Sequence, residues 1–588
     1  MKNILFKVLA FALSLSCVFS VACDGGEPTH VHVFDKTVVT EEFLKSAGNC
    51  QTQAEYYYSC ECGEVGSRTF LHDKTGHDFS AERHEEEFLK FPATCQSGAV
   101  YYKSCQTCGL AHNFHTFTWG ERGECVFNEE VASLEYLYSA ATREDSAVYY
   151  KSCICGKKGT ETFSYGEPLK SYTEEEKIPY TPTSLTVTLY DAKNSVYGFT
   201  WNTEKAPLYP VVQIQKGNNL TNDCQEVLAT VTKGSSYDEN NKEITYYIVK
   251  AEVQLKSLET YTYRAYDKYV DIGTAATTVQ TKDVNSTSFT FAHVSDSQTT
   301  EGTGYGGTYF AKTLSKIVGN NDFIVHTGDV VENSKYEYEW TAMLHDNFNY
   351  LSQIPIMAIS GNHETTYKNG SNETFKHFNY KLPAQASTEQ GLFYSFIYGN
   401  TKFIMLNTND LIGNKLKDEQ YNWLTNELKN NTCTWTVVSL HNPLYSVGKY
   451  GADSSRNAIA LALRSQLRGI FAQYEVDIVL QGHDHAISRT YPINASGVPQ
   501  TERWETINGV EYSIDPNGVI YVMNGPAGNQ SRSPYEIDSS FYHYAGASKA
   551  CSWAEFTISG NKLTVSVKYT DGTNVNVYHT WGISKTAV

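Results

Sequence analysis

The stretches SFTFAHVSDSQ (residues 288–298) and DFIVHTGD (residues 322–329) decide the fold of this chain. Each is an apolar run that ends in polar residues, among them an aspartate. Between them, TYFAKTLSKIVGN (residues 308–320) has the apolar spacing of an amphipathic helix. A strand, a helix and a second strand in this order predict an α/β fold, in which the loops after the strands build the site.

Three further apolar runs also end in polar residues, namely IPIMAIS (354–360), WTVVSL (435–440) and VDIVLQ (476–481). The potential metal ligands at the five strand ends are Asp296, Gln298, Asp329, Asn362, His441, His483 and His485. Taken singly, each would indicate a turn or a surface residue. Five strand ends in succession that carry such residues predict a metal centre, because carboxylate, imidazole and amide oxygen together suit Zn, Mn or Fe.

The order of these motifs closely resembles the calcineurin-like metallophosphoesterase superfamily over about residues 287–545. The resemblance implies a four-layer α/β/β/α sandwich with two metal ions. It assigns Asp296, Gln298, Asp329 and His485 to one ion. It assigns Asp329, Asn362, His441 and His483 to the other, so that Asp329 bridges the pair. Two such ions would hold a hydroxide that attacks a phosphate ester in line.

The resemblance also assigns a catalytic role to His363, next to Asn362 in the run GNHE (361–364). It would stabilise the transition state or protonate the leaving oxygen, and Glu364 would orient it. The alternative is that His363 is only a structural partner.

Local matches such as LKDEQYNWLTNEL, HNPLYS and IYVMNGPAG resemble purple acid phosphatases in particular. Three positions depart from that pattern. Glu332 stands where those enzymes have a metal-binding tyrosine, and Gln298 stands where a histidine is common. Gly451 replaces a substrate-binding histidine of some members, so that Lys449 or Tyr450 would have to substitute unless both are solvated loop residues. The identity of the metals, Fe, Zn or Mn, therefore stays open.

Residues 174–286 precede the expected catalytic domain of residues 287–588. They alternate strand-like runs such as SLTVTLYD, VYGFTWNT and YTYRAYD with Asn, Gly and Pro, which predicts a small β-sandwich. Trp201 and Tyr263 within it resemble the fibronectin-like domain of purple acid phosphatases. We expect both rings to be core residues rather than ligand contacts.

Residues 24–173 contain three repeats, at about 30–75, 76–123 and 124–170. The copies open at His32, His77 and Cys125, and a cysteine follows 28 positions later in each, at Cys60, Cys105 and Cys153. A second cysteine closes each copy at Cys62, Cys108 and Cys155. Eighteen positions after each opener stand Cys50, Cys95 and Arg143.

Each of the first two repeats thus offers one histidine and three cysteines, and the third lacks one ligand. The sets are His32, Cys50, Cys60 and Cys62, and His77, Cys95, Cys105 and Cys108. Both ligand sets suit structural zinc. Disulfides are the alternative, because an exported protein meets an oxidising environment. The third alternative is that the cysteines form neither zinc sites nor disulfides. In any of these cases we expect the repeats to present the catalytic domain to a cell-surface partner.

The first 22 residues, with Lys2, Lys7 and an apolar run from Val8, predict an export signal. The sequence before Cys23 resembles a lipobox, so that a lipid on Cys23 would tether the chain to a membrane; free secretion is the alternative. The net charge of -18 argues against a nucleic-acid partner. We expect an exported metal-dependent phosphatase of small phosphate monoesters. The alternatives are a phosphodiesterase with the same site and a surface-binding protein with an inactive phosphatase-like domain.

Overall fold

The computed structural model describes residues 31–142, 145–168, 172–299, 307–365, 373–386, 392–452, 457–535 and 537–586. These residues divide into two compact units. The first comprises the described residues up to Glu129 together with Ser152–Lys157, and the second comprises Glu130–Lys151 and the chain from Lys158 onward. The predicted export signal and Cys23 lie outside the described residues.

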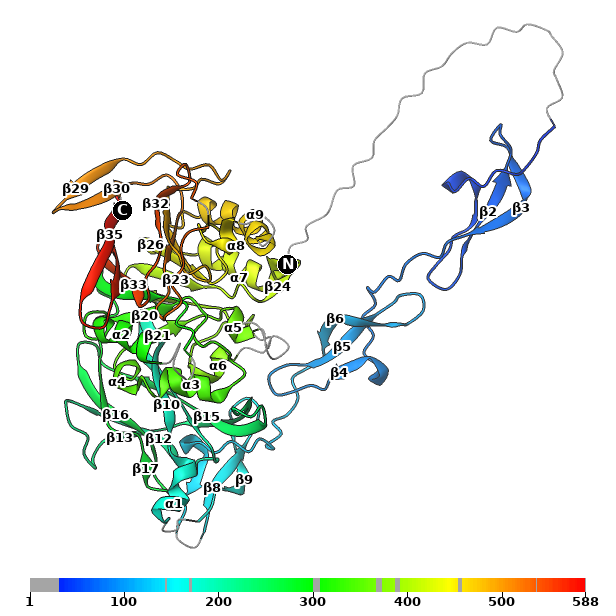
Figure 1. Ribbon diagram of the computed structural model, residues 1–588. Helices are drawn as coiled ribbons and strands as arrows, with labels where there is room; N and C mark the ends of the chain where they lie inside the picture. Colours follow the sequence, from blue (N-terminus) through cyan, green and yellow to red (C-terminus); the bar gives the residue numbers. More distant parts are fainter. Residues whose placement is uncertain are drawn as a thin grey trace. The chain divides into compact units, whose positions relative to one another are not determined.

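Each repeat is a small antiparallel sheet of three strands (Figure 1). The strands are β1 (Leu44–Ser46), β2 (Ala54–Ser59) and β3 (Val65–His72), then β4 (Leu89–Phe91), β5 (Ala99–Ser104) and β6 (Ala111–Trp119), then β7 (Leu137–Ser139), β8 (Ala147–Ser152) and β9 (Lys158–Tyr165). The aromatic residue before each first strand, Phe43, Phe88 or Tyr136, ends a single 3₁₀ turn and is buried. That aromatic side chain anchors the repeat.

The expected grouping of the cysteines by repeat is wrong for Cys50 and Cys95. Cys50, in the loop after β1, lies with His77, Cys105 and Cys108 of the second repeat. Cys95, in the loop after β4, lies with the cysteines of the third repeat, which are Cys125, Cys153 and Cys155. The third repeat therefore lacks no ligand. A constant spacing along the chain does not show which copy a loop reaches.

The part of the third repeat in the second unit packs on the β-sandwich. Tyr136 and Tyr149 share an apolar cluster with Leu208, Tyr209 and other residues of the sandwich. The Tyr269 hydroxyl accepts a hydrogen bond from the Ala141 amide at 3.0 Å. This contact continues the sandwich core into the repeat.

The sandwich has two antiparallel sheets, in the orders β10-β11-β15-β14 and β13-β12-β16-β17, with β18 also paired to β16. Its strands are β10 (Thr183–Asp191), β11 (Val196–Thr203), β12 (Pro210–Lys216), β13 (Gln225–Leu228), β14 (Thr230–Tyr237), β15 (Glu243–Gln254), β16 (Thr260–Asp267), β17 (Ile272–Gly273) and β18 (Thr277–Gln280). The prediction that Trp201 and Tyr263 are core residues is confirmed, since they are 1% and 0% exposed. The Tyr263 hydroxyl donates to the Ser352 carbonyl across the border with the next domain.

The part of the chain after the sandwich has two large sheets. One has the order β21-β20-β19-β33-β34-β35-β30-β29, and the other the order β22-β23-β26-β27-β31-β28-β32. The first contains β19 (Ser288–Val294), β20 (Phe323–His326), β21 (Ile356–Ala358), β29 (Trp504–Ile507), β30 (Val510–Ile514), β33 (Ser552–Ser559), β34 (Lys562–Thr570) and β35 (Val575–Ser584). The second contains β22 (Tyr394–Tyr398), β23 (Thr401–Met405), β26 (Trp435–Leu440), β27 (Ile478–Gln481), β28 (Ile487–Thr490), β31 (Ile520–Asn524) and β32 (Tyr542–Gly546).

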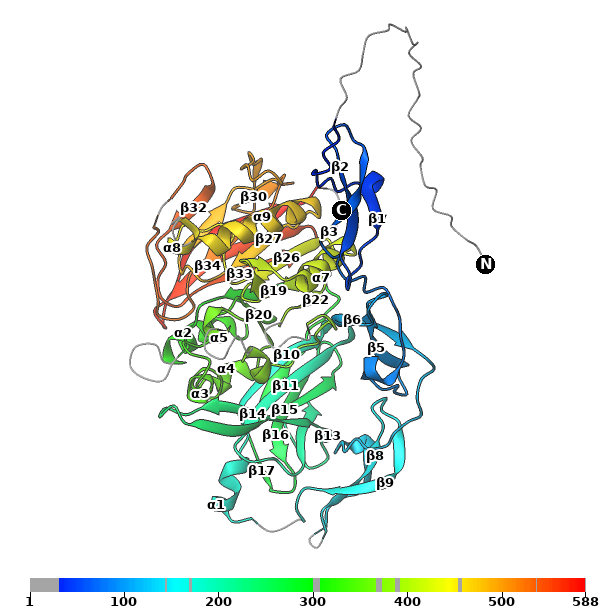
Figure 2. The same ribbon diagram turned by 90° about the vertical axis from the view of Figure 1, so that its right-hand side faces the viewer.

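The two sheets pack face to face around aromatic side chains. Phe291 of β19 stacks on Phe556 of β33 and meets Phe403 of the other sheet edge-on, with the rings 5.1 Å apart. Helix α2 (Gly307–Ile317) joins β19 to β20, which run parallel, so the predicted strand–helix–strand unit is confirmed. Helices α7 (Asp418–Lys429) and α9 (Ala458–Gln473) cover β26 and β27 (Figure 2).

The remaining helices are short. They are α1 (Glu174–Lys177), α3 (Glu337–Leu344), α4 (Phe348–Leu351), α5 (Asn362–Thr365), α6 (Thr374–His377) and α8 (Lys449–Ala452). A two-stranded ribbon, β24 (Leu411–Ile412) and β25 (Lys415–Leu416), precedes α7. Within the described ranges, no helix has the length and apolar character needed to cross a membrane.

Candidate metal centre

The structure brings the seven predicted ligands together at the carboxyl ends of five strands. Asp296 and Gln298 follow β19, Asp329 follows β20, Asn362 begins α5 after β21, His441 follows β26, and His483 and His485 follow β27. The ligand atoms form two groups, and within each group they lie within 4.8 Å of one another. The groups are Asp296, Asp329 and His485, and Asp329, His441 and His483. Asp329 belongs to both groups. Two cations in these groups would share its carboxylate.

The tautomers of two histidines suit a metal. His441 Nδ1 donates to the Thr327 carbonyl at 2.8 Å, and His485 Nδ1 donates to the Gln530 carbonyl at 2.7 Å. Because a carbonyl only accepts, the proton of each neutral ring is on Nδ1 and the Nε2 lone pair points elsewhere. His441 Nε2 faces Asn362 Oδ1 at 3.0 Å, and His485 Nε2 faces Asp296 Oδ1 at 3.2 Å. When the rings are neutral, each Nε2 atom and the oxygen that it faces are both acceptors, an arrangement suited to a shared cation.

Gln298 supplies an independent indication. Its Oε1 atom is buried and has no hydrogen-bond partner among the described residues. A buried amide oxygen without a partner costs about 1–3 kcal/mol, which a cation would offset. The donor set therefore fits two metal ions, with the neutral amide in place of an imidazole.

The backbone at the ligands is strained. Asp296, Asp329, His483 and His485 have φ values of +52°, +54°, +77° and +54°, and Gln298 has +40°. Side chains with a Cβ rarely adopt this region, and the strain costs about 1–3 kcal/mol per residue. Five such residues at one place indicate that the surrounding fold holds a strained backbone, which lowers stability but orients these side chains towards one another.

Charge inside the site is balanced between carboxylates and imidazoles. Burial alone would raise the pKa of Asp329, but His441, His363 and His483 hold it well below its ordinary value. Burial opposes a charge on His441, yet Asp329 and Asp296 raise the pKa of its imidazole to about 9. Burial, helped by repulsion from His441, lowers the pKa of His483 to about 3. A proton on the His441 imidazole would therefore compete with a metal ion for Nε2.

Metal affinity should therefore rise with pH. Below pH 9 the His441 imidazolium must lose its proton before Nε2 can bind, so we expect about a tenfold gain in affinity per pH unit from pH 6 towards pH 9. Above pH 9 the gain should end. Competition with a chelator of known affinity at each pH measures this. An affinity that is flat between pH 6 and 9, after correction for the chelator, would contradict the assignment of His441.

His363 lies inside the site, but Glu364 does not orient it. His363 Nε2 is 3.2 Å from Gln298 Nε2 and 3.8 Å from Asp329 Oδ2, and its Nδ1 donates to the Glu332 carbonyl. The expectation for Glu364 is wrong. Its carboxylate is fully buried and accepts the backbone amides of Asp329, Val330, Val331 and Gly361 at 2.7–3.2 Å. Glu364 shapes the strained loop that carries Asp329.

Glu332, which departs from the purple acid phosphatase pattern, and Tyr450, next to the departing Gly451, both lie near predicted site residues. Glu332 is half-buried and accepts a hydrogen bond from Gln530 at 3.1 Å, outside both ligand groups. Tyr450 lies with its ring 4.3 Å from that of His483. Tyr450 and Lys449 line a hollow that also includes Asp484, Arg532 and Tyr535. Arg532 was not predicted, because nothing in the sequence around it indicates a site.

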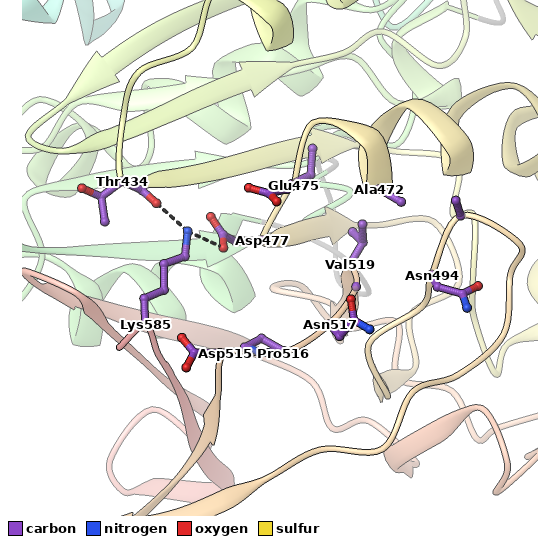
Figure 3. A pocket seen from close by; sticks show the side chains of 13 residues that line it. Thr434, Ala472, Glu475, Asp477, Asn494, Asp515, Pro516, Asn517, Val519 and Lys585 are labelled. Atoms are coloured by element: carbon purple, nitrogen blue, oxygen red, sulfur yellow. Dashed lines mark hydrogen bonds and ion pairs between the residues drawn. The ribbon is translucent and has the colours of Figure 1, made fainter. Parts of the chain in front are cut away.

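A separate hollow lies at the opposite edge of the second catalytic sheet (Figure 3). It is lined by Thr434, Asp477 and Val519, the residues directly before β26, β27 and β31, and Lys585 spans it by pairing with Asp477 at 2.7 Å. Sites of α/β folds are built at the carboxyl ends of strands. The amino-edge hollow is therefore not the catalytic site.

This fold and this ligand set define a metallophosphoesterase of the class that uses binuclear metal centres. Residues 289–486 match the family model described as "Calcineurin-like phosphoesterase", and this segment is a domain of that family.

Proteins similar to this chain include acid phosphatases of plants and mammals. Purple acid phosphatase 15 of Arabidopsis thaliana is 28% identical over 194 residues, which cover 32% of this chain and 32% of the relative. Acid phosphatase type 7 of Homo sapiens is 27% identical over 242 residues, which cover 37% of this chain and 51% of the relative. The chain thus spans a third to a half of the length of these relatives.

A solved purple acid phosphatase from yellow lupin (Lupinus luteus) seeds has the same fold. The similarity covers 69% of this chain and 74% of that one, with a TM-score of 0.57 and 17% sequence identity.

Proposed function

We propose that the protein is an exported, metal-dependent phosphatase that hydrolyses phosphate monoesters at a binuclear site. The observation that carries the proposal is the pair of ligand groups that share Asp329. Two metal ions there would lower the pKa of a water molecule and offset charge on the phosphoryl oxygens. Because the water then acts as nucleophile, no nucleophilic side chain is needed.

The role of His363 follows from its place beside Asp329. The hydrogen bond from Nδ1 to the Glu332 carbonyl fixes the ring and leaves Nε2 facing the site. From there Nε2 is positioned to contact a phosphoryl or leaving oxygen. Burial opposes a charge on His363, but Asp329 and the Glu332 carbonyl raise the pKa of its imidazole, so the imidazolium form would carry the Nε2 proton that an acid needs. A positioned acid of this kind contributes about 10²–10⁴-fold to a rate.

Preference for a monoester rests on the hollow beside His483. Lys449 and Arg532 are exposed cations in that hollow, and Tyr450 joins the hollow to the metal centre. The Asp484 carboxylate is bound to the amides of Tyr450 and Gly451, both at 2.9 Å. A monoester carries more negative charge at the phosphoryl group than a diester, so two exposed cations in the hollow favour it.

Replacing Arg532 with alanine should raise KM for a small monoester about tenfold and leave kcat within about twofold. A charge-assisted hydrogen bond contributes about 1.5–3 kcal/mol, and the exposed position places the effect at the lower end. Steady-state kinetics with a monoester and a diester measure it, and Arg503→Ala, an exposed arginine outside the hollow, is the matched control. An unchanged KM would remove Arg532 from the substrate site.

The reaction itself is tested by assaying a monoester beside a diester with Mn, Zn or Fe across pH. We expect the higher kcat/KM for the monoester. Faster diester hydrolysis would favour the second candidate, a phosphodiesterase with the same site. No turnover of either ester with any metal would favour a surface-binding protein with an inactive domain. Export, a lipid tether at Cys23 and a surface partner of the repeats belong to the proposal, and fractionation of cells carrying the wild type or Cys23→Ser tests the tether.

A further inference from the structure

We propose that the repeats bind two zinc ions, each shared between consecutive repeats. The first site takes Cys50 from repeat one and His77, Cys105 and Cys108 from repeat two. The second takes Cys95 from repeat two and Cys125, Cys153 and Cys155 from repeat three. In both groups the four ligand atoms lie within 4.8 Å of one another. All eight residues belong to the first compact unit.

The spacing of the ligand atoms is that of a tetrahedral ion. Sulfurs bound to zinc at about 2.3 Å lie about 3.8 Å apart, and sulfur and nitrogen about 3.5 Å apart. In the first site the Cys50 and Cys105 sulfurs are 3.5 Å apart. In the second site the Cys125 and Cys155 sulfurs are 3.7 Å apart, and the Cys95 and Cys153 sulfurs are closer, at 3.0 Å. Cys108 Sγ is 3.2 Å from His77 Nδ1. A disulfide would need about 2.0 Å, and it would join only two of the four ligands.

The backbone prepares three ligands of each site within one repeat. The closing cysteine pair sits in a tight turn, in which Gly109 donates to the Cys105 carbonyl at 3.0 Å and Gly156 donates to the Cys153 carbonyl at 2.7 Å. These glycines have φ values of +74° and +83°, a conformation that glycine adopts without strain. The turn holds the two cysteines of the pair together, and the opener of the same repeat is the third ligand.

The fourth ligand arrives from the preceding repeat on a short loop. Cys50 and Cys95 occupy the loops between β1 and β2 and between β4 and β5. Beside Cys95, Gln96 Nε2 donates to the Ile154 carbonyl at 3.2 Å, so a direct hydrogen bond accompanies the second site. At the corresponding position of the third repeat the sequence has Arg143, and the β-sandwich follows instead of another repeat. A cysteine occurs where there is a next repeat to receive it.

The small size of the repeats gives a reason for the ions. In the described part of the second repeat, the buried apolar residues are Ala81, Phe88 and Cys105. Domains this small need metal ions or cross-links because they bury too little apolar surface. A shared zinc would stabilise each repeat and also fix its neighbour. The residues His32, Cys60 and Cys62 form a third group, of three ligands, and no shared site is assigned there.

The test is alkylation of cysteines in the full-length protein, read peptide by peptide by mass spectrometry. The zinc content of the same samples is also measured. All variants carry Asp329→Asn, which weakens metal binding at the catalytic centre and leaves every cysteine in place, so that the zinc counted is mainly that of the repeats. In the parent, the seven cysteines of the two sites should resist alkylation until EDTA is added. Cys50→Ala should expose Cys105 and Cys108 and leave Cys60 and Cys62, of its own repeat, as in the parent. It should also lower the zinc content by one ion per chain.

Cys95→Ala should expose Cys125, Cys153 and Cys155 instead, and Cys224→Ala, outside both groups, should change nothing. Exposure of Cys60 and Cys62 by Cys50→Ala would overturn the sharing between repeats. Cysteines that stay unreactive after denaturation in EDTA without reductant would be disulfide-bonded and would overturn zinc itself. Neither outcome depends on phosphatase activity, so this proposal and the proposed function fail separately.

Discussion

Replacing Asp329 with asparagine is expected to lower kcat/KM at least about a thousandfold. The change removes the one carboxylate that belongs to both ligand groups, and with it the charge that offsets the repulsion of two cations. Loss of about 4 kcal/mol of stabilisation in the transition state corresponds to this factor. Steady-state assays with saturating Mn or Zn measure it, together with the metal bound per chain, which should fall.

Asp477→Asn is the matched control. Asp477 is also a buried carboxylate and lies directly before β27, at the opposite edge of the sheet from the metal centre. It pairs with Lys585 and accepts the Thr436 amide at 2.8 Å. The control should lower thermal stability and leave kcat/KM within about threefold. A buried carboxylate this far from the metal centre affects the stability of the fold and not the reaction. If Asp329→Asn retained activity near that of the control, the bridging carboxylate would be wrongly assigned.

His363→Ala should lower kcat about 10²–10³-fold while the metal content stays that of the wild type. His363 is outside both ligand groups, yet its Nε2 atom is 3.8 Å from Asp329 Oδ2. Removing an acid that acts on the leaving oxygen costs rate and not metal. The loss should be largest for esters with poor leaving groups, since these depend most on proton donation.

The leaving-group series separates catalysis from structure. A merely structural His363 would cost the same factor for every ester, or would release metal along with activity. His345→Ala, on a histidine directly after α3, is a control that should leave both readouts unchanged. Equal losses across the series would assign His363 to positioning alone.

The strand ends could be predicted because their chemistry is local. An apolar run followed by Gly-Asp or Gly-His is visible in the sequence, and β20 and β27 form there. Parallel pairing of β19 with β20 and of β26 with β27 then places the loops at one edge. What brings the loops of the two different sheets together is the packing around Phe291 and Phe403, which no single segment encodes.

The role of Glu364 could not be predicted from its position beside His363. Successive residues of a short helix point in different directions, and the Glu364 carboxylate turns towards four amides of the loop that carries Asp329. Cys50 presents the same difficulty. Whether it joins the ligands of its own repeat or of the next one depends on the direction of the loop after β1, which the spacing of the cysteines does not show. Arg532 belongs to a segment without a motif, so only the fold brings it into the hollow that Tyr450 also lines.

The most direct test of the binuclear centre is anomalous X-ray diffraction from crystals grown with Mn or Zn. We predict two peaks about 3.5–4 Å apart, as in two-metal sites, with the Asp329 carboxylate bound to both. Gln298 and His485 should bind one ion, and Asn362 and His483 the other. A single peak, or two peaks of which only one touches Asp329, would contradict the account.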